Sequence, residues 1–357
     1  MKYIIKINNL QLILAIAATM LLAACNKEPE QFTEAAVTPP TGITLGATIA
    51  ASPSDSLYYR LIAKAGLIDM INDPTSNNTM FVPGNLAMKL FINAISGGQV
   101  PLAAPDAVFS GFITTVIPQA SAAGIVSYNI LPQPLLSANI PATFPNLPYP
   151  SILNPAPTVS AFLRLTTFPT TNNGAWVSNI PITAVDLKAS NGVIHHTAFL
   201  VTPPQRFLWN RISTDPELTY LKAAINRADS GTSAPGTLQG ALLNIGANLT
   251  VFAPTDAAFK ALLRGAIYKA LLPIVIQQLT VFSNPALYGV LTAQTVKAII
   301  VYHIFGNRAF TNNFPVTTTY YPTLLNGGIP THPGVGLTAT FGVPFVTSAT
   351  IKGVGNA

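Results

Sequence analysis

Two segments of this chain repeat the same residue pattern, and this repeat limits the architectures that the chain can adopt. Residues 79–89 read TMFVPGNLAMK, and residues 250–260 read TVFAPTDAAFK. A second pair follows in the same order, GIVSYNIL at residues 124–131 and AIIVYHIF at residues 298–305. Landmarks that recur in one order at nearly equal offsets indicate duplication of a structural unit. With 357 residues, the chain is long enough for two such units.

The second copy of the pattern predicts a short strand followed by a helix. Residues 249–253 alternate in the manner of a strand. Pro254 ends this strand because proline cannot donate to a ladder. Thr255 can then cap a helix that begins at Asp256, whose carboxylate meets the positive end of the helix dipole.

Each repeat also opens with a predicted helix. In the first repeat, apolar side chains from Leu57 to Ile68 share one helical face, and Ser54 or Asp55 can cap its start. In the second repeat, residues 215–217 read Asp-Pro-Glu, which is the order of a capping residue, a first-turn proline and a first-turn acid. We therefore expect a helix to begin at Asp215.

The composition excludes several classes of function. Charged residues make up only 8% of the chain, against roughly 25% in ordinary soluble proteins. Eighteen basic residues spread over the whole length form no stripe that could displace counterions from nucleic acid, so no nucleic-acid partner is expected. The single cysteine, Cys25, excludes an intrachain disulfide and a thiolate metal site. We expect no metal and no cofactor.

The amino terminus has the three parts of an export signal over residues 1–24: a basic start, an apolar stretch and a small-residue end. Residues 22–25, Leu-Ala-Ala-Cys, resemble the lipobox of bacterial lipoproteins. This resemblance implies that Cys25 is acylated and that the signal is cut before it, with several acyl chains making the membrane attachment stable. The alternative is an ordinary signal peptide whose cleavage site happens to lie beside a cysteine.

Residue 26 is Asn and not Asp, so the resemblance to inner-membrane retention signals is absent and outer-membrane delivery is favoured. Residues 25–50 show no sustained apolar period. We therefore interpret them as the lipidated cysteine and a flexible tether.

The repeated motifs resemble those of fasciclin domains. Residues 250–259 are similar to the first signature box of that family, residues 191–195 (Asn-Gly-Val-Ile-His) to its second box, and Tyr302-His303 to the pair between the boxes. The resemblance implies an α+β fold in which each domain is a wedge-shaped β-sandwich with a flanking layer of helices. It places domain 1 at residues 51–204 and domain 2 at residues 205–357.

The resemblance also supplies the candidate site residues, which are signature positions with a structural or an interaction role. They are Thr250, Phe252, Pro254, Thr255, Asp256, Tyr302, His303, Asn191, Gly192 and His195.

No catalytic apparatus is expected. His195 and His196 are neighbours on a predicted strand and therefore point to opposite faces, which prevents them from sharing a metal. A hydrogen-bonding role for His195 and His303 is favoured over catalysis. The sequence holds no Gly-x-Ser-x-Gly elbow, no evident carboxylate pair and no phosphate-binding glycine loop. We therefore expect the protein not to be an enzyme.

The second repeat departs from the family at its end, because no Asn-Gly-x-Ile-His segment follows residue 351. We expect domain 2 to lack its closing strand, either because the sequence is truncated, which is favoured, or because a neighbouring chain supplies the strand. An uncovered edge is a pairing liability that a strand-donating partner would relieve.

Residues 131–157 form a proline-rich insert with Phe144 and Tyr149. Its eight prolines rule out a long helix. It either presents an aromatic, extended surface to a ligand or covers the sheet as a long crossover, and the second interpretation is favoured.

The function expected from these features is that of a lipid-anchored envelope protein. The resemblance implies adhesion, or binding of an extracellular or periplasmic protein or polysaccharide. Two alternatives remain open: an accessory lipoprotein of an outer-membrane uptake assembly for glycans or nutrients, and a purely structural envelope lipoprotein.

Overall fold

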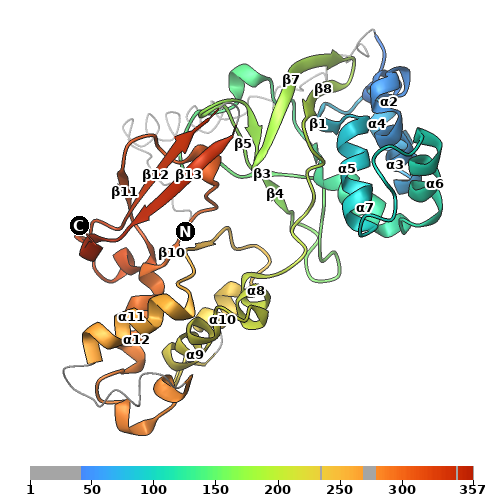
Figure 1. The fold of residues 1–357 in the computed structure, drawn as a ribbon. Helices are drawn as coiled ribbons and strands as arrows, with labels where there is room; N and C mark the ends of the chain where they lie inside the picture. The colour runs from blue at the N-terminus through green and yellow to red at the C-terminus, as the bar shows by residue number, and fades with distance from the viewer. Residues whose placement is uncertain (1–41, 234, 268–278, 343–344, 357) are drawn as a thin grey trace, which may run out of the picture. The chain divides into compact units, whose positions relative to one another are not determined.

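The computed structural model describes residues 42–233, 235–267, 279–342 and 345–356 (Figure 1). Residues 40–357 belong to one compact unit. Runs of helices and runs of strands follow one another along this unit, so the expected α+β class is confirmed.

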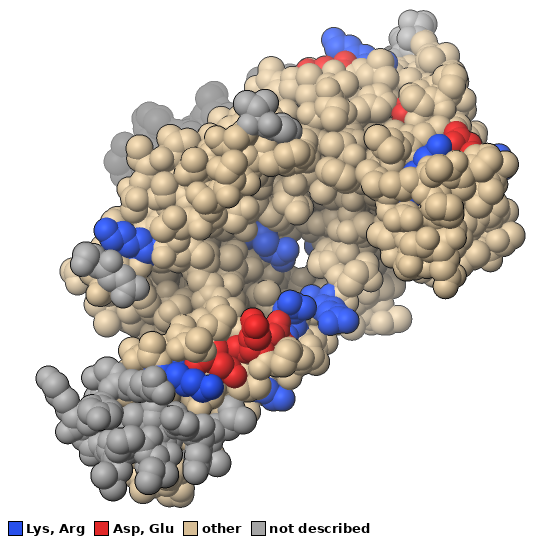
Figure 2. Space-filling model, in the orientation of Figure 1, with Lys and Arg blue, Asp and Glu red and all other residues tan. Residues whose placement is uncertain are grey.

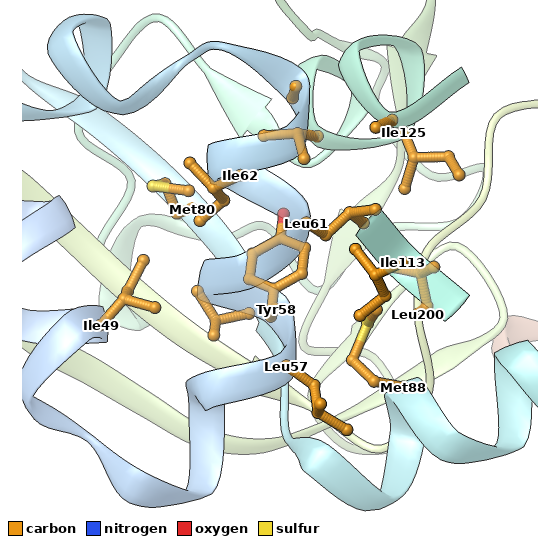
Figure 3. Close-up of a cluster of buried hydrophobic side chains, with 14 of the residues drawn as sticks. Ile49, Leu57, Tyr58, Leu61, Ile62, Met80, Met88, Ile113, Ile125 and Leu200 are labelled. Carbon is orange, nitrogen blue, oxygen red and sulfur yellow. The ribbon is translucent and has the colours of Figure 1, made fainter. Parts of the chain in front are cut away.

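The first repeat begins with a group of helices, coloured blue to blue-green in Figure 1. They are α2 (Leu45–Ala51), α3 (Ser56–Ala65), α4 (Ile68–Asn72), α5 (Asn85–Ile95), α6 (Asp106–Thr115) and α7 (Gln119–Tyr128). Their apolar faces enclose a core whose centre is the fully buried ring of Tyr58 (Figure 3). The predicted face is confirmed from Leu57 to Ala65 as the buried face of α3, but its extension to Ile68 is wrong, because Gly66 ends α3 and Ile68 begins α4.

Helix α2 corrects the expected tether. Leu45 and Ile49 of α2 are buried in the core, and Ile49 lies beside the α3 side chains in Figure 3. Thr44 caps the helix by accepting a hydrogen bond from the N–H of Ala47 at 3.3 Å. A helix of two turns buries too few apolar residues to produce a visible period, which explains the error. The tether prediction is wrong from residue 44 onward, and residues 25–41 lie outside the described residues.

A six-stranded sheet follows, in the order β2-β1-β8-β7-β6-β5. Its strands are β1 (Asn78–Pro83), β2 (Ile130–Leu131), β5 (Pro169–Thr170), β6 (Trp176–Val177), β7 (Ile180–Ala189) and β8 (Gly192–Thr197). Strand β8 lies parallel to β1, with Asn78 opposite Gly192, so the end of the first repeat returns to its beginning. A separate pair is formed by β3 (Tyr149–Pro150) and β4 (Thr166–Thr167).

The second repeat has its own helical core, built around Tyr220, Phe259 and Phe282. Its helices, yellow to orange in Figure 1, are α8 (Leu208–Thr214), α9 (Thr219–Ala228), α10 (Leu238–Leu242), α11 (Asp256–Ile267) and α12 (Ala293–Tyr302). Its strands are β9 (Thr250–Val251), β10 (Ile304–Phe305), β11 (Thr319–Tyr321), β12 (Val335–Phe341) and β13 (Val346–Lys352). Strands β9 and β10 form one pair, and β11, β12 and β13 form a three-stranded sheet.

The two repeats share the register of their central strand pair. Thr79 lies opposite Leu131 in β1 and β2, and Thr250 lies opposite Phe305 in β9 and β10. These four residues are the positions that the sequence repeat aligns. Within the described residues β9 pairs with β10 alone, whereas β1 also pairs with β8. The missing closing strand stays a prediction.

The helix start predicted at Asp215 is wrong. Residues 215–218 form a turn in which Asp215 Oδ1 accepts from the N–H of Glu217 at 3.0 Å, and α9 begins at Thr219. In the first repeat Asp55 stands before α3, but its side chain makes no capping bond. Both helices are capped instead by a side chain from a later segment of the chain, as described below.

The proline-rich insert packs on the second repeat. The ring of Phe144 lies 4.9 Å from that of Tyr321, 5.7 Å from that of Phe314 and 6.2 Å from that of Phe305. Phe314 belongs to the buried cluster formed with β12, so the insert covers the three-stranded sheet. Phe144 thus packs against protein, in agreement with the favoured interpretation of the insert.

Asparagine side chains join the two repeats beside this cluster. Asn146 Nδ2 donates to Asn313 Oδ1 at 2.8 Å, and both residues are buried. Asn172 and Asn313 exchange two bonds, in which each side-chain amide donates to the carbonyl of the other residue at 3.0 and 3.2 Å. Asn312 donates to the carbonyl of Ser178 at 3.2 Å. Amide and aromatic contacts therefore join the repeats, together with a bond from the Thr166 hydroxyl to Asn248 Oδ1 at 3.2 Å and the contact of the Arg308 guanidinium with the Phe168 ring at 5.7 Å.

No single helix within the described residues has the length and hydropathy needed to cross a membrane. Helices α6 and α7 pass that test only as a pair, and they meet at 109°.

Candidate functional site

Asn191 ties together four segments of the first repeat. Its Oδ1 accepts from the N–H of Leu45 at 2.7 Å. Its Nδ2 donates to the carbonyls of Ile71 and Asp73 at 2.9 and 2.8 Å, and to the Ser76 hydroxyl at 3.2 Å. Every polar atom of this fully buried side chain is therefore used inside the protein.

Gly192, the next residue, has no room for a side chain. A Cβ atom built on Gly192 would lie 2.1 Å from the carbonyl oxygen of Asn78. The glycine thus permits β8 to approach β1 closely enough to pair with it. The pair Asn191-Gly192 is a structural element of the fold.

His195 lies in β8, is fully buried and is bonded at both ring nitrogens. Nε2 donates to the carbonyl of Leu135 at 2.7 Å, and Nδ1 accepts from the N–H of Asp186 at 3.3 Å. The Phe81 ring stacks on the imidazole at 5.9 Å. Burial lowers the pKa of His195, and this outweighs the opposing effects of the Leu135 carbonyl and the Asp186 carboxylate. The imidazole is therefore a neutral structural group.

The neighbouring His196 points the other way. Its Nε2 lies 3.1 Å from the carboxylate of Asp55, and Asp55 is buried. Burial, the largest influence, raises the pKa of Asp55, but hydrogen bonds from His196, Ser52 and Ser54 outweigh it and lower the pKa overall. The prediction that the two histidines occupy opposite faces is confirmed. No local pattern indicates the pairing of His196 with Asp55, because 141 positions separate the partners.

We expect acid to weaken the first repeat through His195. In the unfolded chain a histidine has a pKa of about 6.5, and the folded value is lower, so the unfolded state binds more protons as the pH falls below about 6.5. Between pH 7.5 and 5.5 this lowers the free energy of unfolding by up to about 1.4 kcal/mol. The carboxylates of Asp55 and Asp186 have lowered pKa values, so their stabilisation is lost only at more acidic pH.

Urea unfolding of wild type and His195→Gln at the two pH values measures this effect. The variant should lose the pH-dependent step, whereas His332→Gln, a change at a histidine in a loop of the second repeat, should keep it. An identical pH dependence in wild type and His195→Gln would contradict the assignment.

Thr79 and Thr250 form the same hydroxyl clamp in the two repeats. The hydroxyl of Thr79 donates to the carbonyl of Gln133 at 2.8 Å and accepts from the N–H of Leu135 at 2.7 Å. The hydroxyl of Thr250 donates to the carbonyl of Asn307 and accepts from the N–H of Ala309, both at 2.8 Å. Each clamp fixes the loop that leaves the second strand of the pair.

Replacing either threonine by valine keeps the shape of the side chain and removes both bonds. We expect Thr79→Val to cost about 2 kcal/mol, because the Leu135 N–H becomes unpaired in the interior, and Thr250→Val about 1 kcal/mol, because Thr250 is only half-buried. Urea unfolding followed by circular dichroism measures both values. If Thr250→Val lowers the free energy of unfolding as much as Thr79→Val or more, burial does not explain the difference expected between the two variants.

Asn85 and Asp256 cap the first helix of their repeats from a distance. Asn85 Oδ1 accepts from the N–H of Leu57 at 3.0 Å, and Asp256 Oδ1 accepts from the N–H of Tyr220 at 2.9 Å. The second oxygen of Asp256 accepts a short hydrogen bond from the Thr219 hydroxyl. Sequence analysis placed Asp256 at the start of α11, which is confirmed, but missed this second role.

The remaining signature residues of the second repeat also have structural roles. Thr255 accepts from the N–H of Ala258 at 3.4 Å, as predicted for the cap of α11. Phe252 packs on the aromatic cluster and donates its N–H to the carbonyl of His303 at 2.9 Å. Strand β9 covers only Thr250–Val251, so it ends before Pro254, and the prediction that Pro254 ends a strand over residues 249–253 is wrong.

Tyr302 and His303 end helix α12. The Nδ1 of His303 donates to the carbonyl of Ile299 at 2.8 Å, which is the favoured hydrogen-bonding role. The Tyr302 hydroxyl donates to the carbonyl of Gly334 at 3.2 Å and accepts from the N–H of Val354 at 3.1 Å. Its ring packs edge-to-face on His303 and His332.

The candidate residues thus do not converge on one centre. Asn191, Gly192 and His195 support the first repeat, and the other candidates support the second. Within the part of the chain that the structure describes, no three His, Cys, Asp or Glu side chains are grouped to hold a metal ion. Figure 2 shows few charged side chains on the face in view. Cys25 lies outside the described residues.

A cavity that no sequence pattern indicates lies beside Arg308. It has a volume of about 360 Å³ and is lined by residues of both repeats. Only the fold brings these segments together, so no local pattern could indicate the cavity.

Comparison with known proteins identifies the first repeat. Residues 54–198 match the model of the Fasciclin domain. No curated protein matches the chain. Among solved structures, the FAS1 domain pair of the insect cell adhesion molecule fasciclin I is 14% identical, with 80% of this chain and 83% of that chain covered and a TM-score of 0.27. A TM-score this low does not establish a shared arrangement.

Proposed function

We propose that this chain, whose residues 54–198 form a Fasciclin domain, is a lipid-anchored envelope protein that mediates adhesion or binds a protein or polysaccharide outside the cytoplasm. The observation that carries the proposal is the domain match, because Fasciclin domains are associated with adhesion and binding. The buried signature residues support it: their polar atoms bond within the protein, which leaves recognition to the surface.

A second domain of the same kind over residues 205–357 belongs to the proposal. Its support is the shared strand register, the repeated threonine clamp and the repeated cap of the first helix. These three features involve side chains at matching positions of the sequence repeat, which two unrelated folds would not reproduce together.

The loop between β3 and β4 is the best surface candidate for recognition. Phe162 is 91% exposed and Val159 is 82% exposed. Two hydrogen bonds hold the loop in place. At its base, Ser151 donates its N–H to the carbonyl of Leu165 at 2.8 Å. Inside the loop, Asn154 Nδ2 donates to the carbonyl of Ser160 at 2.8 Å. Exposed apolar side chains on a fixed loop are typical of interaction sites.

Binding to a glycan array and capture from solubilised membranes test the role of this loop. We expect Phe162→Ala to weaken the captured interaction by at least about fivefold, the loss of roughly 1 kcal/mol, while Leu86→Ala, a change at another exposed apolar side chain, leaves it unchanged. Stable co-purification with a transporter would favour the accessory role instead. Equal binding by wild type and Phe162→Ala would remove the loop from the proposal.

The anchor rests on the sequence alone. Residues 22–25 and the position of the only cysteine support acylation of Cys25 and delivery to the outer membrane. Mass spectrometry of the mature amino terminus should find an acylated cysteine, and Cys25→Ser should move the protein from the membrane to the soluble fraction. An unmodified thiol at the mature amino terminus would refute the anchor and leave the domain assignment intact.

A further inference from the structure

The cavity of about 360 Å³ lies between segments of the two repeats. Its lining includes Leu165 of the first repeat and Phe207, Leu242 and Val251 of the second, and Arg308 and Arg206 contribute charged groups to its wall. Its size is within the range of small-molecule sites, about 300 to 1,000 Å³. Most of its lining is apolar, with a few polar groups, which is also typical of such sites.

Arg308 lacks a partner for its charge. No hydrogen bond or ion pair joins its guanidinium to another described residue, and its Nε is fully buried and unbonded. The guanidinium lies 5.7 Å from the centre of the Phe168 ring. It also borders a second cavity of about 270 Å³, lined by Tyr128, Phe168 and Phe310.

Arg308 is half-buried, and its Nε has lost its hydration without gaining a hydrogen bond or a counter-charge from the described residues, which is costly. Neither cavity is lined by Asp or Glu. Tyr128 does not supply the charge either: burial raises the pKa of its hydroxyl to about 12, and this hydroxyl donates to the carbonyl of Thr166 at 2.9 Å. An anionic ligand in the cavity would supply the counter-charge that these lining residues do not.

We propose that this cavity binds a small apolar carboxylic acid in its ionised form, with the carboxylate on Arg308 and the hydrocarbon part against the apolar wall. The planar guanidinium matches the two oxygens of a carboxylate. A dianionic phosphate fits less well, because the only other cation in the lining, Arg206, is exposed. The proposal concerns a small ligand and is independent of the adhesive role.

Calorimetry with the full chain in lipid nanodiscs tests this proposal, with 4-phenylbutyrate as the probe and 4-phenylbutan-1-ol as its uncharged counterpart. Titration of empty nanodiscs corrects for partitioning into lipid. We expect the acid to bind at least about tenfold more tightly than the alcohol, as a charge-assisted bond to a partly buried arginine implies. Arg308→Met should abolish this difference, and Arg60→Met, a change at an exposed arginine, should preserve it.

Ala247→Phe provides a second variant that keeps Arg308 and fills the cavity from its wall. It should weaken both probes by at least about tenfold. If Arg308→Met folds poorly, Ala247→Phe and the comparison of acid with alcohol in the wild type still test whether the cavity binds the carboxylate. Equal affinities for acid and alcohol, undiminished binding in a folded Arg308→Met or Ala247→Phe variant, or displacement of the acid by equimolar inorganic phosphate would overturn the proposal.

Discussion

Asn191→Ala is expected to lower the free energy of unfolding of the first repeat by about 4 kcal/mol. The change removes four hydrogen bonds at once. It also leaves the N–H of Leu45 and the carbonyl of Ile71 without a partner in the interior, and the methyl group of alanine cannot replace either contact. Urea unfolding, followed by the fluorescence of Trp176 in a Trp209→Phe background, measures the loss in this repeat.

Two further variants sharpen the test. Asn77→Ala alters an exposed asparagine in the same repeat and should change the stability by less than about 0.5 kcal/mol. Asn191→Asp keeps the acceptor for Leu45 but turns a carboxylate oxygen toward the carbonyls of Ile71 and Asp73, so it should destabilise at least as much as alanine. A mild effect of Asn191→Asp would show that the Nδ2 bonds contribute little.

Phe144→Ala is expected to destabilise the second repeat by about 3 kcal/mol, although residue 144 belongs to the insert of the first. The reason is the loss of three aromatic contacts, to Phe305, Phe314 and Tyr321, and the cavity that remains beside the three-stranded sheet. Hydrogen exchange measured by mass spectrometry locates the effect. Peptides that cover β12 should exchange faster, while those that cover α3 should not change.

Phe162→Ala is the matched control, because it removes the same ring from a solvent-exposed site. It should leave exchange in both repeats unchanged. Faster exchange in α3 than in β12 after Phe144→Ala would mean that the insert stabilises its own repeat and does not cover the second one.

The duplication could be predicted because it rests on local patterns that recur. Thr79 and Thr250 stand at matching positions of the sequence repeat, and the same strand register follows in both repeats. The opposite orientations of His195 and His196 follow from the two-residue period of a strand. The cap of α11 at Thr255 is local as well.

The features that sequence analysis missed depend on contacts between distant segments. Helix α2 forms because Leu45 donates to Asn191, which follows it by 146 positions. Helix α9 begins at Thr219 and not at Asp215 because Asp256, from the next strand–helix unit, caps it. Arg308 lines two cavities because residues of both repeats pack around it. The residues next to Arg308 in sequence do not predict these contacts.

The asparagine bonds between the repeats have a consequence for the conditions under which the protein stays intact. Amide and carbonyl groups gain or lose no proton in the ordinary range of pH, and they carry no net charge that ions could screen. Each of the three ion pairs among the described residues lies inside a single repeat. These asparagine bonds between the two halves are therefore insensitive to acidification and to changes in salinity.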